Sequence, residues 1–455
     1  MGISALGTGS SILTQDLLDQ LKEADTAAQV TPIELEIANE NDKKAEYDVI
    51  DANMTNLADS ITELRTPALF DERTTSVVGT SVEITASANS DLQDFTLDVT
   101  QLATKQIEES GSYTATTDTI ATGAGSINLN IDGVDFTIDY DATTTLDDLK
   151  KSINDVAGDK VSATIVQVAA GDYRLFLNSV DTGSTQDITL TDNTGNLSGT
   201  QLTTDMTAVQ TGVDAEFTFN GQAITRTSNN VDDLVTGYDI TLKELGVSEV
   251  SVTQNRDNIL EKIDSFIEKY NATVSELTRA TKNSTDAEER GIFSGESTMK
   301  SMQSALRNML DNAGSEVGNL YEYGFDVDKD GKLSIDKTVF NAKMDENPAN
   351  VEVFFTGGDF TNADGTTTAV NGAFNDISTL VDEYTKFNGM LDQYKDYLTD
   401  GIASLEDRKL TAIERLDAKY EILKQQFAAF DAMIAQLNNA SAMFTEMQNT
   451  SNQDN

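Results

Sequence analysis

The sequence of 455 residues contains no cysteine, no histidine and no tryptophan, and it has only three prolines. Without cysteine there are no disulfide bonds, no thiol nucleophiles and no zinc-thiolate sites. Without histidine, the commonest general base and metal ligand is missing. Among the remaining residues we find no catalytic constellation. We therefore expect a protein that is not an enzyme and that binds no cofactor and no metal.

Positive charge is also scarce, since 31 lysines and arginines stand against 77 aspartates and glutamates. The resulting formal charge of -46 would repel phosphate groups. We therefore expect no binding to nucleic acid. The acidic residues are better explained as a solvated surface than as a trap for cations.

Long hydrophobic runs are absent as well. No run approaches the 18 or so apolar residues that a membrane-spanning helix needs, so no membrane insertion is expected. Residues 1–11 show neither the basic segment nor the apolar stretch of a signal peptide. If the protein is exported, we expect export without a cleaved signal peptide.

The most regular stretch of the sequence lies near the C-terminus, between residues 413 and 444. Its apolar residues recur in alternating steps of three and four, which is the pattern of a coiled-coil seam. At 1.5 Å per residue the segment would form a helix roughly 48 Å long, and such a narrow apolar stripe needs a partner. The series is Ile413, Leu416, Tyr420, Leu423, Phe427, Phe430, Ile434, Leu437 and Phe444.

The N-terminal region predicts the matching helices. A first helix, capped by Ser11 or Thr14, would carry Leu13, Leu17 and Leu21 on one face. Together with the C-terminal series, these leucines form the expected seam for a partner or for other copies of the chain.

A second helix is predicted to begin at a capping box, with Thr31 as the cap, Pro32 at the first position and Glu34 three residues after Thr31. It would end at Thr66-Pro67. Its apolar face could belong to an ordinary bundle core or to a coiled coil. The residues of that face are Tyr47, Ile50, Met54, Leu57, Ile61 and Leu64.

Between residues 76 and 254 the helical period gives way to alternation, which predicts a β-rich region. Asp132-Gly133 and Asn220-Gly221 stand between alternating segments and predict two-residue hairpin turns. An Asp-Asp-Leu triplet follows each hairpin, at 147–149 and at 232–234, which suggests a weak internal repeat.

Helices are expected again at 257–280 and 297–311, and a glycine-rich connection at 356–372 precedes a last long helical run. Steps of four at Leu405, Lys409 and Ile413 predict a local unwinding of any supercoil. The predicted fold class is α+β and multidomain, with a coiled-coil stalk, a helical middle domain and an inserted β-rich head.

The domain boundaries follow from these changes of pattern. The stalk would comprise residues 1–45 and 411–455. The helical domain, with a small β-hairpin, would comprise residues 46–75 and 255–410. The head, residues 76–254, would contain two subdomains, one formed by about 76–111 with 206–254 and the other by 112–205.

Two acidic motifs were considered as sites. Residues 326–331 open like a calcium loop, but Lys337 occupies the twelfth position, where a bidentate glutamate belongs. A hairpin is therefore the better interpretation. The paired acids Asp147-Asp148 and Asp232-Asp233 could serve as acid and base in glycoside hydrolysis, but in so acidic a chain they are better explained as solvated surface.

Several segments resemble the flagellar filament cap family, also called hook-associated protein 2. Residues 95–103 match the family's Tyr-x-Leu-x-Val-x-Gln-Leu-Ala strand, with Phe95 in place of Tyr. Residues 9–21 resemble the family's opening and first helix, and residues 420–431 its closing segment. Similar likenesses occur at 127–130, 149–154, 173–179, 214–221, 228–230 and 237–242.

The resemblance implies an extracellular structural protein at the tip of the bacterial flagellum, which orders the polymerisation of flagellin. It implies a ring-like homo-oligomer as the working form and flagellin as a partner, with hook-associated junction proteins and an export chaperone as further partners. Two alternatives stay open, namely another flagellar axial protein and a surface adhesin that uses the threonine-rich head for cell adhesion.

Overall fold

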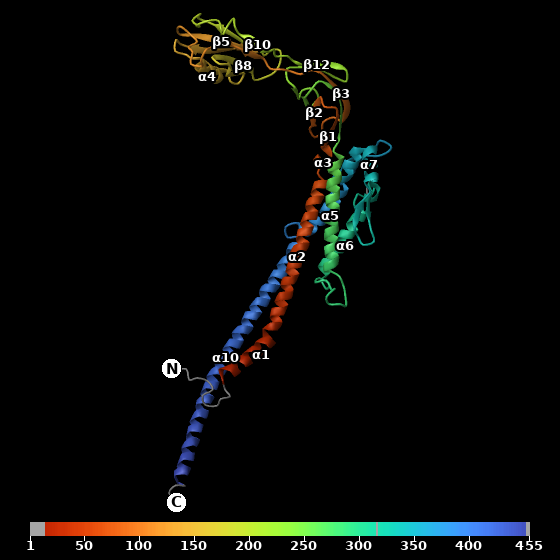
Figure 1. The fold of residues 1–455 in the computed structure, drawn as a ribbon. Coiled ribbons are helices and arrows are strands. Elements are labelled where there is room, and N and C mark those ends of the chain that lie inside the picture. Colours follow the sequence, from red (N-terminus) through yellow and green to blue (C-terminus); the bar gives the residue numbers. More distant parts are fainter. Residues whose placement is uncertain (1–13, 315–316, 452–455) are drawn as a thin grey trace. The chain divides into compact units, whose positions relative to one another are not determined.

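The computed structural model describes residues 14–314 and 317–451. The chain divides into two compact units, one formed by residues 1–67 with 259–455 and the other by residues 68–258. The first unit is mainly helical and the second is mainly β (Figure 1). The predicted α+β class is confirmed, because the terminal helices pack together and the β-rich part is inserted between them.

The helical unit contains the two ends of the chain. Helices α1 and α2 run beside α10, a single helix of 62 residues that spans about 93 Å (Figure 1). Its helices are α1 (Gln15–Gln29), α2 (Thr31–Leu64), α5 (Arg256–Ala280), α6 (Ser297–Asn312), α7 (Lys337–Glu346), α8 (Pro348–Thr356), α9 (Ala373–Thr385) and α10 (Met390–Ser451), with a 3₁₀ turn η1 (Leu320–Tyr323).

The start of α2 differs from the sequence prediction. Val30, between α1 and α2, keeps a helical backbone, and no side chain caps α2. The predicted capping box at Thr31 is therefore wrong, although Pro32 does lie in the first turn. Glu34, the glutamate of the predicted capping box, forms an ion pair instead: its carboxylate lies 2.7 Å from Lys409 Nζ of α10. Since the chain hardly leaves the helical conformation at Val30, few backbone groups there need a cap.

The second half of α2 provides the core of the helical unit. The six predicted apolar residues from Tyr47 to Leu64 are all buried, so that prediction is confirmed. The Tyr47 hydroxyl donates a hydrogen bond to the carbonyl oxygen of Leu391 at 3.0 Å, which ties α2 to the first turn of α10. Aromatic rings fill the space around α9, where Phe374 stacks on Phe355 with ring centroids 4.8 Å apart.

Two small hairpins belong to the helical unit. The first, β16 (Phe325–Val327) with β17 (Leu333–Ile335), confirms the hairpin interpretation of residues 326–331. Asp328 Oδ1 accepts hydrogen bonds from the backbone N–H groups of Asp330 and Lys332, so this acid shapes the turn. The second, β18 (Gly358–Thr361) with β19 (Thr367–Val370), occupies what the sequence suggested was only a glycine-rich connection.

The β-rich unit begins with the short helix α3 (Ala68–Asp71) and contains two hydrophobic cores. Around the first lie a five-stranded sheet in the order β1-β15-β3-β11-β12 and a three-stranded sheet in the order β13-β14-β2. These strands are β1 (Arg73–Val78), β2 (Val82–Ala86), β3 (Gln93–Gln101), β11 (Ala215–Phe219), β12 (Gln222–Arg226), β13 (Asn230–Val231), β14 (Tyr238–Leu242) and β15 (Gly246–Gln254).

The second core lies among helix α4 (Leu146–Ala157), a four-stranded sheet in the order β10-β4-β8-β7 and a three-stranded sheet in the order β6-β5-β9. The alternating burial of β5 explains why its pattern was readable from the sequence. The strands are β4 (Ile107–Glu109), β5 (Gly125–Ile131), β6 (Val134–Tyr140), β7 (Val161–Ala169), β8 (Asp172–Ser179), β9 (Thr189–Asp192) and β10 (Thr207–Gln210).

The two predicted hairpin turns of the β-rich unit are confirmed. Asp132 and Gly133 have φ values of 51° and 72°, and Asn220 and Gly221 have φ values of 49° and 81°. A two-residue turn with positive φ at both positions matches the twist of the flanking strands, and Asn, Asp and Gly tolerate that conformation best.

The paired acids have structural roles. Asp148 forms a capping box with Thr145 at the start of α4, and Asp147 pairs with Lys150 at 2.9 Å. Asp233 pairs with Arg226 at 2.8 Å in a turn between β13 and β14. Because the first Asp-Asp-Leu triplet opens a helix and the second lies in a turn, the suggested internal repeat is not a structural one.

Candidate functional site

The segment around α1 and the middle of α10 meet in a small apolar cluster, which we call the terminal cluster and which consists of Leu18, Val30, Leu416 and Tyr420. The exposed fractions of these side chains are 8% or less. Ile413, Leu423 and Phe427 of α10 are half-buried against the cluster. The sequence predicts that the C-terminal series packs against the N-terminal helices. The first half of the series, from Ile413 to Phe427, does so.

On α1, the buried position differs from the predicted one. Leu18 is 3% exposed, whereas Leu17 is half-buried and Leu21 is 43% exposed. Leu13 lies outside the described residues. Thr14 caps α1 by accepting a hydrogen bond from the backbone N–H of Leu17 at 3.2 Å, as predicted.

The inner face of α1 was hidden in the sequence because charged residues lie on it. Lys22 Nζ pairs with Asp417 at 2.7 Å. The Asp25 carboxylate accepts a hydrogen bond from the Tyr420 hydroxyl at 2.8 Å and pairs with Lys419 Nζ at 2.5 Å. Those hydrogen bonds, from Lys419 first and then from Tyr420, lower the pKa of Asp25 below its ordinary value. Leu18 and Asp25 are seven residues apart, which places them on the same face of the helix. This spacing could have indicated the inner face of α1, but a charged residue such as Asp25 is not expected on a packed face.

Beyond Phe427, the predicted series becomes exposed. Phe430, Leu437 and Phe444 are 55%, 71% and 69% exposed, and Ile434 is half-buried. The exposed residues continue the three-four spacing as a row that we call the terminal stripe. The terminal stripe consists of Phe430, Met433, Leu437, Ala440, Phe444 and Met447.

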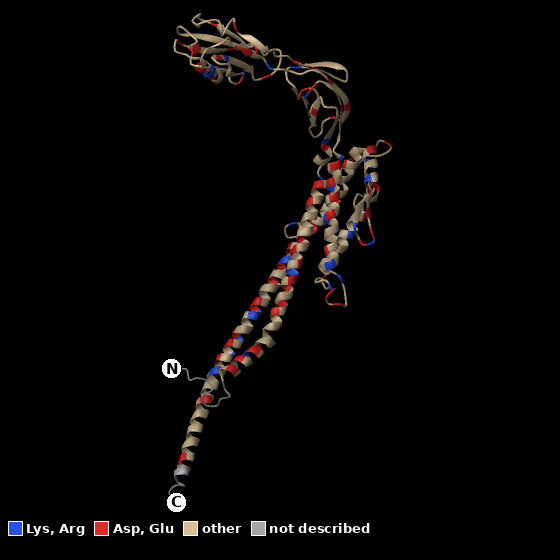
Figure 2. Ribbon diagram, viewed as in Figure 1, with Lys and Arg blue, Asp and Glu red and all other residues tan. Residues whose placement is uncertain are grey.

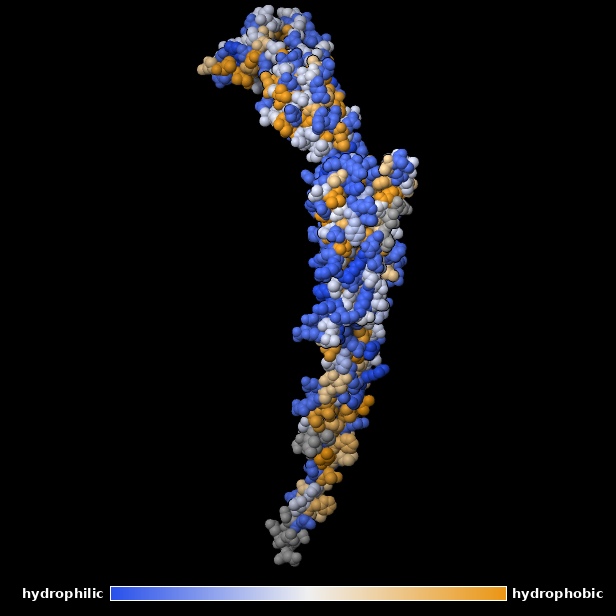
Figure 3. Space-filling view, turned by 90° about the vertical axis from the view of Figure 1, so that its right-hand side faces the viewer, coloured by the Kyte–Doolittle hydropathy of each residue, from blue (hydrophilic) through white to orange (hydrophobic). Residues whose placement is uncertain are grey.

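The terminal stripe lies in a segment that is nearly free of charge. Between Gln425 and Gln448 only Asp431 and Glu446 are charged, and Figure 2 shows this end of α10 mostly in tan. Figure 3 shows orange, hydrophobic surface gathered on the same end of the helical unit. An apolar helix face in an otherwise strongly acidic chain is typical of an interaction surface.

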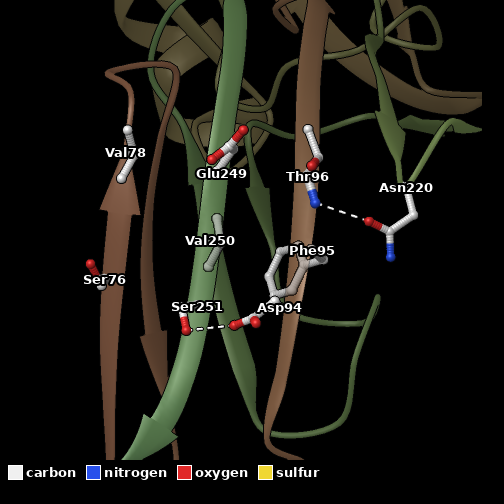
Figure 4. A pocket seen from close by; sticks show the side chains of 9 residues that line it. All are labelled: Ser76, Val78, Asp94, Phe95, Thr96, Asn220, Glu249, Val250 and Ser251. Atoms are coloured by element: carbon white, nitrogen blue, oxygen red, sulfur yellow. Dashed lines mark hydrogen bonds between the residues drawn. The ribbon is translucent and has the colours of Figure 1, made fainter.

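One hollow of the β-rich unit was a candidate for chemistry because a serine and an acid meet in it, but it offers no catalytic site. On the outer face of the five-stranded sheet, a shallow hollow of about 400 Å³ is lined by Val78, Thr96, Glu249 and other residues (Figure 4). Ser251 lies in this hollow, and its hydroxyl donates a hydrogen bond to Asp94 at 2.5 Å. The chain has no histidine that could serve as the general base for a serine nucleophile.

Within the described residues, 14–314 and 317–451, two other classes of site are absent. No group of three or more acidic side chains in these ranges is arranged so that it could hold a metal ion. No helix within them has an apolar stretch of the length needed to cross a membrane. The most prominent feature of the described residues is therefore the terminal stripe, an apolar helix face of the kind that packs against another helix.

Comparison with known proteins identifies the family. The model of the flagellar hook-associated protein 2 N-terminus matches residues 10–106, and that of its C-terminus matches residues 212–439. The chain belongs to the flagellar hook-associated protein 2 family, whose members are structural proteins of the flagellum and not enzymes.

Relatives match along nearly the whole chain. The flagellar hook-associated protein 2 of Aeromonas caviae is 24% identical and covers 98% of this chain and 99% of its own length. The protein of the same name from Escherichia coli K12 is 26% identical and covers 99% of both. The crystal structure of the D1-D2-D3 domains of the Escherichia coli flagellar cap protein FliD matches with a TM-score of 0.58 at 24% identity, and it covers 78% of this chain and 99% of that one. This last likeness concerns the fold.

Proposed function

We propose that this flagellar cap protein works as a ring-like homo-oligomer at the tip of the filament, and that its terminal stripe contacts flagellin and neighbouring copies. Membership of the family supports the general role, which is to cap the filament and promote flagellin polymerisation. The observation that carries the finer proposal is the exposure of the terminal stripe.

The physical argument starts from the packing of α10. An apolar row that runs for several helical turns is costly to leave in water, and a coiled-coil partner removes that cost. Leu437 at 71% and Phe444 at 69% are among the large apolar side chains exposed on α10. The near absence of charge matters equally, because two copies of a chain with a net charge of -46 repel one another elsewhere.

The predicted domain division is retained as part of the proposal. Residues 1–45 with 411–455 would form the stalk that reaches the filament, residues 46–75 with 255–410 the helical domain, and residues 76–254 the head. Hook-associated junction proteins and an export chaperone are proposed as further partners. Export without a cleaved signal peptide is proposed as the route to the filament tip.

The test is a charge placed in the terminal stripe. We expect Leu437→Asp in the full-length chain to abolish its oligomers and the motility of cells that depend on it, because a buried carboxylate would have no partner. Leu410→Asp is the matched control, since Leu410 is 57% exposed on the same helix but outside the terminal stripe. The measurements are the mass of each variant in solution, by light scattering, and the motility of cells that carry it.

Normal oligomers and normal motility with Leu437→Asp would overturn the proposal. The β-rich unit should unfold at the same temperature in both variants, which ensures that a loss of assembly is not a loss of folding.

A further inference from the structure

The sulfur atoms of this chain are distributed unevenly. Because there is no cysteine, the 11 methionines hold all of its sulfur. Five of them are at most 5% exposed and lie in the helical unit, where they contribute to the core. These buried methionines are Met54, Met299, Met302, Met309 and Met344.

The exposed methionines lie in the same unit but on a single helix, α10. Met433, Met443 and Met447 are 60%, 67% and 66% exposed, and all three are in the last turns of α10. Met433 and Met447 belong to the terminal stripe, and Met443 lies beside Phe444. The one other strongly exposed methionine among the described residues is Met390, which is 48% exposed at the start of the same helix.

We propose that Met433, Met443 and Met447 are sites of oxidation by peroxide, and that their oxidation prevents assembly without unfolding the protein. The inference rests on the proposed function, because it assigns the consequence of oxidation to the terminal stripe. Thioether exposure sets the order in which methionines react, so the three should react before the buried ones.

The reaction is a two-electron transfer of oxygen. The thioether sulfur attacks one oxygen of hydrogen peroxide, and an S–O bond forms while the O–O bond breaks. The proton on the transferred oxygen passes to the displaced hydroxide, which leaves as water. The sulfur is oxidised to a sulfoxide and the peroxide is reduced. Methionine sulfoxide is polar and chiral, so it packs poorly in an apolar helix interface.

The location of these residues makes the effect selective. A sulfoxide at Met433 or Met447 would place an S–O dipole in the row that must be buried on assembly. The core of the helical unit would be unchanged, since its five buried methionines are shielded. Oxidation of the free chain would therefore mimic a charge in the terminal stripe, whereas an assembled chain would be protected because its stripe is covered.

The experiment uses the full-length chain treated with hydrogen peroxide. Mass spectrometry of its peptides should show Met433, Met443 and Met447 oxidised at least tenfold faster than Met54 and Met344. The assembled fraction, measured by light scattering, should fall at least tenfold, while the thermal unfolding of the chain stays within a degree or so. Treatment with methionine sulfoxide reductases should restore assembly.

Two variants separate a specific effect from general damage. In the triple variant Met433→Leu, Met443→Leu, Met447→Leu the apolar row is kept and the sulfur is removed, so assembly should persist and should resist peroxide. Met390→Leu is the control, and it should assemble normally and should remain as sensitive to peroxide as the unmodified chain.

The possible failures are distinguishable. If the untreated chain does not assemble, or if Leu437→Asp assembles normally, the proposed function fails. If the untreated chain assembles, Leu437→Asp does not, and the oxidised chain still assembles, then only the oxidation inference is overturned. Equal sensitivity of the triple variant and the unmodified chain would also overturn it.

Discussion

The two halves of α2 are held in place by different forces. From residue 47 to residue 64 the helix buries one apolar side chain in every turn. From residue 31 to residue 46, all of which are described, no side chain is buried, and the same is true of residues 399–415 on α10. We call these two facing segments the polar section.

Ion pairs and a hollow replace apolar packing in the polar section. Glu34 pairs with Lys409 at 2.7 Å, and Glu36 pairs with Arg408 at 3.5 Å. A hollow of about 580 Å³ lies there, beside Tyr397 and Gly401. The residues for which the sequence predicts a local unwinding of the supercoil, Leu405 to Ile413, belong to this polar section. The polar section therefore connects the terminal cluster to the core around residues 47–64 of α2 with little apolar packing. We expect the cluster and this core to open independently.

The largest effect is expected in the packed half of α2. Leu57→Ala should lower the free energy of unfolding of the helical unit by about 2–5 kcal/mol, because Leu57 is fully buried and its truncation leaves a cavity. Urea unfolding followed by helical circular dichroism measures this. Val49→Ala, at a position 48% exposed on the same helix, is the control and should cost less than about 0.5 kcal/mol. Equal costs for the two variants would contradict the comparison.

A smaller and local effect is expected at the terminal cluster. Leu416→Ala should destabilise the packing of α1 against α10 by about 2 kcal/mol, because it removes a buried side chain of the terminal cluster. The loss should be at the low end for such a truncation, because the cluster is small. Hydrogen exchange should then accelerate in residues 15–29 but not in residues 47–64. If exchange accelerated equally in both segments, the joint would not separate them. Leu410→Ala, at an exposed position, should change neither.

The pH dependence of hydrogen exchange is a further test of whether α1 and the packed half of α2 open separately. Because its partners lower the pKa of Asp25 below 3.8, its contribution to the packing of α1 is present above pH 3.8 and is lost as the pH falls through the lowered pKa. The pKa values of Lys419 and Tyr420 are raised, chiefly by the hydrogen bond with Asp25 for Lys419 and by burial for Tyr420, so these two groups lose their protons only at alkaline pH and do not contribute to the acid response.

We therefore expect hydrogen exchange in α1, after correction for its intrinsic pH dependence, to accelerate below about pH 4 while the packed half of α2 stays protected. In Asp25→Asn this additional acceleration should be absent. An unchanged acid response in that variant would show that another group is responsible.

The smallest effect is expected from the ion pairs of the polar section. Glu34→Gln should change the free energy of unfolding by less than about 0.5 kcal/mol, because the pair with Lys409 is solvent-exposed and screened by salt. Urea unfolding at low and high salt measures the change, with the unmodified chain as the reference. A cost above about 1 kcal/mol would mean that the polar section is a rigid element after all.

The regular patterns of the sequence predicted much of the fold. The steps of three and four in α2 and α10, the alternation of the strands and the Asp-Gly and Asn-Gly turns each reflect a local physical preference, and each appears in the structure. Short elements were missed. Helix α4 does carry an apolar face, at Leu146, Leu149, Ile153 and Ala157, but its 12 residues lie inside a region of alternating strands. The hairpin of β18 and β19 is almost wholly exposed and has no apolar pattern that stands out.

The candidate site was only partly predictable. Its position on α10 followed from the apolar spacing, but the sequence did not separate the residues that pack inside the chain, such as Leu416 and Tyr420, from those that stay exposed, such as Leu437 and Phe444. That separation depends on where α1 lies against α10. It also depends on Lys22 and Asp25, whose charges hid the inner face of α1.

The sequence by itself determined the long helices and most of the strands, the acidic surface, the absence of cysteine and histidine chemistry, and the existence of an apolar helix near the C-terminus. All of these are properties of the residues and of their local spacing. The tertiary structure decided which apolar residues are covered, because burial depends on which segment lies opposite. It covered the apolar face of α2 from residue 47 to residue 64 and left the terminal stripe of α10 exposed, with its methionines in the open.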